Sequence, residues 1–128
     1  MAETNQVSPA LQRLAPCPSS PNCVGTLSTS DRHRIEPYRY RGSLDEAKRR
    51  LKEVVVAQRG ARIVKEDETY LHAEFTSRIF RFVDDVEFVF EDETKTIHFR
   101  SASRTGYSDF GVNRNRMEEI RRLLNEKR

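Results

Sequence analysis

Apolar and polar residues alternate along the second half of the chain, and this alternation predicts β-strands. Short connections such as Asp92-Glu93-Thr94 favour antiparallel hairpins between consecutive strands. Residues 33–41 are also predicted to be extended, and Pro37 within them marks an edge or irregular strand. The four predicted strands of the second half are residues 61–66, 69–77, 80–91 and 95–104.

Two further segments carry apolar residues at helical spacing. Residues 44–59 follow the capping-box pair Ser43 and Glu46, which predicts where that helix begins. Residues 112–126 form the second predicted helix. The predicted fold class is α+β, with an antiparallel β-sheet of about four to five strands and two helices packed on one face. The expected order of elements is β-α-β-β-β-β-α.

The first 30 residues are rich in Ser, Pro, Thr and Asn and show no periodicity. They predict an irregular N-terminal arm (1–30) that precedes a single α+β domain (31–128). The arm contains the only two cysteines of the chain, Cys17 and Cys23. A disulfide between them would close a small loop and contribute about 2–2.5 kcal/mol. The alternatives are free thiols in a reducing compartment or a redox or metal role, for which no second Cys/His pair follows.

Strand alternation also predicts the two faces of the sheet. The core face receives the apolar set Leu71, Ala73, Phe75, Val86, Phe88, Phe90, Ile97 and Phe99. The opposite face receives His72, Glu74, Asp85, Glu87, His98 and Arg100. The second set either forms cross-strand charge pairs in solvent or binds a metal or moves protons. We predict no metal site and no cofactor.

Asp84 conflicts with this division, because alternation places it on the core face beside Val86. A buried carboxylate needs a partner. The candidate partners are Arg81, Arg100 and Arg104, and a β-bulge that turns Asp84 outward would also resolve the conflict.

The chain has 128 residues, 36% of them hydrophobic, and a formal net charge of +3. No run approaches the roughly 20 apolar residues of a membrane span, and the beginning of the chain lacks the pattern of a signal peptide. We therefore expect a soluble, cytoplasmic protein with no integral membrane segment. Nucleic acid is not an expected partner, because the basic residues 48–52 are balanced by nearby acidic ones and no aromatic stacking set accompanies them.

Residues 98–116, HFRSASRTGYSDFGVNRNR, pass from a strand through a glycine-containing loop into a helix. Guanidinium and hydroxyl groups beside a helix start favour an anion-binding site, because unpaired backbone N–H groups point outward there. The same groups can instead tie down a strand-to-helix corner.

Several motifs of the chain resemble those of a known family. They are Cys17-Pro-Ser-Ser-Pro-Asn-Cys23, His72-Ala-Glu-Phe-Thr-Ser77, Phe82-Val-Asp-Asp-Val-Glu-Phe88, Arg100-Ser-Ala-Ser-Arg104, Gly106-Tyr-Ser-Asp109 and Gly111-Val-Asn-Arg114. The chain resembles the bacterial and plastid family called domain of unknown function 1499 over about residues 16–125. The resemblance implies no particular activity.

The polar residues of these motifs are expected to converge at one end of the sheet. The predicted ligand-binding set is Glu74, Asp84, Asp85, Arg100, Ser101, Ser103, Arg104, Tyr107, Asp109, Asn113 and Arg114. The first hypothesis is a binding module for a small polar or anionic ligand. The second is an enzyme that uses Asp84 or Glu74 as general acid or base beside His72. The third is a protein-interaction or assembly module.

Overall fold

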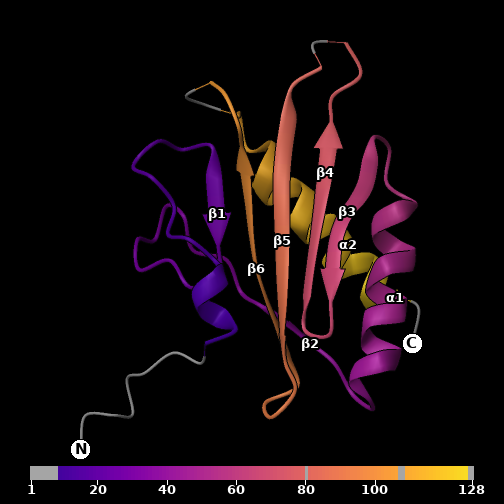
Figure 1. Cartoon of the computed structure of the whole chain (residues 1–128). Coiled ribbons are helices and arrows are strands. Elements are labelled where there is room, and N and C mark those ends of the chain that lie inside the picture. Colours follow the sequence, from indigo (N-terminus) through magenta and orange to yellow (C-terminus); the bar gives the residue numbers. More distant parts are fainter. Residues whose placement is uncertain (1–8, 80, 107–108, 127–128) are drawn as a thin grey trace, which may run out of the picture.

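The structure, a computed structural model, describes residues 9–79, 81–106 and 109–126 and contains one antiparallel sheet. The strand order is β1-β6-β5-β4-β3, and β2 also pairs with β6 (Figure 1). The strands are β1 (Cys23–Gly25), β2 (Tyr38–Arg39), β3 (Ala61–Asp67), β4 (Tyr70–Thr76), β5 (Val83–Glu91) and β6 (Thr96–Ser103). The helices are α1 (Leu44–Val56), α2 (Val112–Glu126) and a short 3-10 helix at Leu11–Arg13.

The predicted fold class and order of elements are confirmed, and the sheet is larger than expected. It has six strands rather than four to five, because Cys23–Gly25 inside the N-terminal arm pairs with the end of β6. Three residues are too short to show alternation, so the sequence pattern did not reveal this strand. Of the extended segment 33–41, β2 joins the sheet, and Arg34 makes an isolated parallel bridge to Gly25 of β1.

Both helices pack on one face of the sheet and enclose the core. Helix α1 begins where expected, because the Ser43 hydroxyl accepts a hydrogen bond from the Glu46 backbone N–H at 3.1 Å. Figure 1 shows α2 crossing behind the sheet and α1 beside β3. Leu51 of α1, Met117 of α2 and Phe88 of β5 are all completely buried in this core. Neither α1 nor α2 is long and apolar enough to cross a lipid bilayer, and the same holds for any helix in the described ranges.

The N-terminal arm covers part of the opposite face, which was expected to be polar. Leu11 and Leu14 form a second, small apolar cluster with Tyr70 and Val89. Tyr70 and Val89 are neighbours on β4 and β5 and both point away from the main core. The arm therefore shields these two side chains from water.

Candidate functional site

A cleft of about 810 Å³ opens at the end of the sheet where β4 leads into β5 and β6 leads into α2. Its walls come from these two connections, from the residues that follow α1 and from the first turns of α2. In Figure 1 both connections extend from the same end of the sheet. The volume is in the range of small-molecule sites in proteins, roughly 300–1,000 Å³. The cleft is therefore the leading candidate for a functional site in the described part of the chain.

An ion pair lies at the floor of the cleft. The Arg116 Nη2 atom donates to the Asp84 Oδ2 atom at 2.7 Å, and the Arg116 guanidinium lies 4.6 Å from the centre of the Phe75 ring. Asp84 is 7% exposed and pairs in register with Phe75 and Ser103. Arg116 of α2 therefore supplies the partner that the Asp84 carboxylate needs on the core face. Neither the candidate partners (Arg81, Arg100, Arg104) nor the alternative of a bulge resolves the conflict, because helix α2 supplies a guanidinium that strand alternation does not predict.

Asn113, in the first turn of α2, is completely buried and connects four parts of the chain. Its side-chain oxygen accepts hydrogen bonds from the Ser101 hydroxyl (2.5 Å) and from Arg116 Nη1 (2.9 Å). Its side-chain nitrogen donates to Asp109 Oδ2 (2.6 Å), to the Ser103 hydroxyl (3.1 Å) and to the backbone oxygen of Asn22 (3.2 Å). With its oxygen and both amide protons engaged, Asn113 acts as a structural hub for this corner.

Asp109 caps the N-terminus of α2. Its carboxylate accepts hydrogen bonds from the backbone N–H groups of Gly111 (2.8 Å) and Asn113 (3.0 Å). Burial by itself would raise the pKa of Asp109, but these bonds and the Asn113 side-chain amide outweigh it and lower the pKa. The protein's own carboxylate thus takes the N–H groups that were expected to bind an external anion. At these N–H groups the second of the two readings of this corner therefore applies, in which the protein's own side chains tie it down.

Three of the predicted site residues form an ion cluster on the sheet face opposite α2. Arg104 donates to Asp85 from Nε (2.7 Å) and to Glu74 from Nη2 (2.6 Å). Arg62 also donates to Glu74 (3.0 Å), and His72 Nε2 lies 2.8 Å from Asp85 Oδ1. The Arg104 hydrogen bonds hold the pKa values of Asp85 and Glu74 below their usual range. Cross-strand charge pairing explains this cluster.

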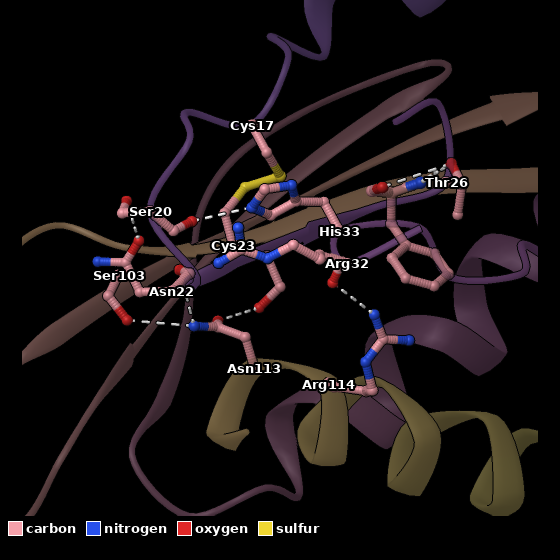
Figure 2. The surroundings of a disulfide bond; sticks show 12 residues. Cys17, Ser20, Asn22, Cys23, Thr26, Arg32, His33, Ser103, Asn113 and Arg114 are labelled. Carbon is pink, nitrogen blue, oxygen red and sulfur yellow. Dashed lines mark hydrogen bonds between the residues drawn. A yellow bond between two sulfur atoms is a disulfide. The ribbon is translucent and has the colours of Figure 1, made fainter. Parts of the chain in front are cut away.

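The three arginines of the predicted site do not converge. Arg104 belongs to the ion cluster just described, and Arg114 donates to the backbone oxygen of Arg32 at 3.1 Å (Figure 2). Arg100 borders a small pocket of about 110 Å³ beneath the N-terminal arm. The expectation failed because alternation directs Arg100 and Arg104 away from α2, whereas Arg114 reaches the segment before β2. Tyr107, the remaining predicted residue, lies outside the described residues.

Cys17 and Cys23 form a disulfide with an S–S distance of 1.99 Å. The neighbouring Asn22 joins this loop to the wall of the cleft. Its backbone oxygen accepts from the Ser103 backbone N–H at 3.0 Å, and its side-chain amide donates to the Gly106 backbone oxygen at 2.6 Å. Figure 2 shows Asn22 between the disulfide and Asn113. The disulfide loop therefore supports the connection from β6 to α2.

Two histidines of the polar face take part in hydrogen bonds rather than in a cluster of ligands. His72 contacts Asp85, as described, and His98 Nδ1 lies 3.0 Å from the Thr26 hydroxyl. Burial lowers the pKa of His98. Among the side chains that the structure describes, no group of three or more His, Cys, Asp or Glu residues is arranged to hold a metal ion.

The sequence does not reveal the cationic and aromatic rim of the cleft. Arg59, Arg78, Phe82 and Phe110 all line the cleft and are exposed. They come from three separate connections, so no spacing in the sequence links them. Arg116 was also missed, although it adjoins Met117, a buried position of the α2 stripe.

Comparison with curated proteins found no match, and comparison with solved structures found none either. The family described as protein of unknown function (DUF1499) matches the chain over residues 13–124. The match includes every strand of the sheet, both connections that border the cleft and most of α2. The chain therefore belongs to the DUF1499 family.

Proposed function

We propose that this protein is a binding module for a small amphipathic anion, which occupies the cleft between the β4–β5 and β6–α2 connections. The ligand would have a carboxylate or phosphate group and an apolar body. The observation that carries the proposal is a cleft of about 810 Å³ with aromatic walls and with arginines that pair with no carboxylate among the described residues.

The charges around the cleft favour an anion. Its carboxylates are already engaged, since Asp84 pairs with Arg116, Asp109 caps α2 and Glu119 pairs with Arg122 at 2.6 Å. Arg59 and Arg78 line the same cleft, and within the described ranges neither is paired with a carboxylate. An anionic group of the ligand would supply the missing partner, most strongly through a bidentate hydrogen bond.

The apolar lining favours a ligand with a hydrophobic body. Phe75 lies at the base of the cleft, while Phe82 and Val112 at its sides are 57% and 47% exposed. Covering these side chains with an apolar ligand would remove them from water, at about 25 cal/mol for each Å² of apolar surface buried. A purely polar ligand would gain nothing from them.

The catalytic alternative has less support from the geometry. Asp84, the buried carboxylate, is held by Arg116 at 2.7 Å. Glu74 and His72 belong to the ion cluster on the other face of the sheet. No substrate in the cleft would therefore lie beside both a free carboxylate and a histidine of the predicted set.

Titration with the anionic, aromatic dye anilinonaphthalene sulfonate tests the proposal by fluorescence. We expect saturable binding that dodecyl phosphate displaces and inorganic phosphate does not. Arg78→Gln should weaken the dye about tenfold, the effect of losing one charge-assisted hydrogen bond. Val112→Asp should weaken it as well, and a carboxylate in the first turn of α2 is compatible with folding.

Arg34→Gln is the matched control, because Arg34 is exposed and does not line the cleft. Its dye affinity should equal that of the wild type. Equal affinities for all four proteins, or displacement by inorganic phosphate alone, would contradict an amphipathic site in the cleft.

A further inference from the structure

We propose that the end of the molecule that bears the cleft also docks on an anionic lipid surface. The residues involved, called here the tip surface, are Ile79, Phe82, Phe110, Arg59, Arg78 and Arg81. This inference goes beyond the proposed ligand, because it adds Ile79 and Arg81, which lie outside the cleft lining, and assigns the exposed rim residues a second contact.

Exposed apolar side chains gather at this end. Of the seven large apolar residues that are exposed in the described part of the chain, four lie on the β4–β5 connection or at the start of α2. Ile79, Phe82 and Phe110 are 81%, 57% and 92% exposed. Single exposed apolar residues are ordinary on a protein surface, but a cluster on adjoining loops is typical of an interaction site.

The backbone conformation around one of these exposed side chains is unusual and is fixed by hydrogen bonds. Phe110 has a φ of 54°, in the left-handed region that bulky residues rarely adopt. Asp109 fixes the chain on either side of this residue, because its carboxylate accepts from the N–H groups of Gly111 and Asn113. A strained, exposed aromatic residue on an anchored loop is a feature of functional sites.

The charge of the tip surface suits anionic headgroups. Arg59, Arg78 and Arg81 are exposed, and no carboxylate in the described part of the chain pairs with them. The acidic residues that line the cleft are already bonded within the protein. Arginines around protruding apolar side chains match a lipid surface, where the apolar groups enter the interface and the guanidinium groups stay at headgroup level.

Sedimentation with vesicles of phosphatidylcholine, alone or mixed with phosphatidylglycerol, tests this docking. We expect the wild type to sediment with the mixed vesicles only, and less so as salt is added. The chain contains no tryptophan, so Phe110→Trp provides a single fluorophore at the tip surface. Its emission should shift to the blue with the mixed vesicles.

Two variants separate docking from ligand binding, because Ile79 and Arg81 do not line the cleft. Arg81→Gln should reduce vesicle binding about fivefold, and Ile79→Ser by at least as much, while dye binding stays unchanged. The matched controls are Arg34→Gln and Val64→Ser, an exposed valine on β3. Absence of binding to the mixed vesicles, or equal binding by the Ile79→Ser variant, would overturn the proposal in favour of a protein partner or of no partner at this surface.

Discussion

Asn113→Leu should strongly destabilise the corner where β6 passes into α2. Leucine has a similar size but removes every hydrogen bond of this completely buried side chain. The substitution leaves the Ser101 hydroxyl and the backbone oxygen of Asn22 without a bond that they now make. Leaving buried polar groups unsatisfied is more harmful than losing the bonds alone, because these groups give up water on folding and gain nothing in return.

The size of the effect follows from the partners. Asn113 makes two hydrogen bonds to charged groups, Arg116 and Asp109, and three to neutral groups. Bonds to charged groups contribute about 1.5–3 kcal/mol and neutral ones about 0.5–1.5 kcal/mol. These contributions do not add fully, because in the variant Arg116 still bonds to Asp84 and Asp109 still accepts from the Gly111 N–H. We expect a loss of about 3–5 kcal/mol in the free energy of unfolding.

Urea unfolding followed by circular dichroism measures this loss as a fall in the midpoint at constant slope. Asn115→Leu is the control, because Asn115 lies on the same helix but is exposed. Its free energy of unfolding should change by no more than about 0.5 kcal/mol. A loss below about 1 kcal/mol for Asn113→Leu would refute the role of this residue as a hub.

Three further predictions concern the acid range, the helix cap and the disulfide. Arg104 lowers the pKa of Asp85, so this pair stabilises the fold above about pH 4, and the stabilisation is lost as the pH falls. Urea midpoints of the wild type and Arg104→Gln should therefore differ at neutral pH and converge at about pH 2. A difference that stays constant with pH would contradict a stabilising Arg104–Asp85 pair. Asp109→Ala should lower the free energy of unfolding by about 1–2 kcal/mol, and Asp109→Asn by less, because an asparagine oxygen can also cap; a loss below about 0.5 kcal/mol for Asp109→Ala would show that the cap is unimportant. Replacing Cys17 and Cys23 by serine should lower it by about 2–2.5 kcal/mol, and a reductant should then have no further effect on the midpoint, in contrast to the wild type.

Strand alternation was enough to predict the two faces of the sheet and the odd position of Asp84. The rule holds because successive side chains of a strand point to opposite faces, whatever they contact. Ser101, two positions after Phe99 on the same strand, likewise lies on the core face, where it bonds to Asn113. Ser43 similarly predicted the start of α1, because an N-terminal cap depends on residues only three positions apart.

The contacts that build the site join residues far apart in the sequence, so no local pattern predicts them. Arg116 reaches Asp84 only because α2 crosses the sheet at a particular angle and rotation. Asn22 reaches Gly106 because β1 pairs with the end of β6. The cleft itself is a property of three connections brought together by the sheet. Residue types could therefore suggest candidates such as Arg100 and Arg114, but not which of them would share a surface.

Because β1 pairs with β6, the sheet of this protein can be completed only late in synthesis. Asn22 and Asn113, which bond at this junction, are 91 residues apart in the chain. A ribosome adds about 5–20 residues per second, so β1 leaves it several seconds before its partner strand exists. The Cys17–Cys23 loop spans only six positions and can close during that interval. The disulfide next to β1 can therefore form early in synthesis, whereas β1 itself can pair with β6 only when nearly the whole chain has been made.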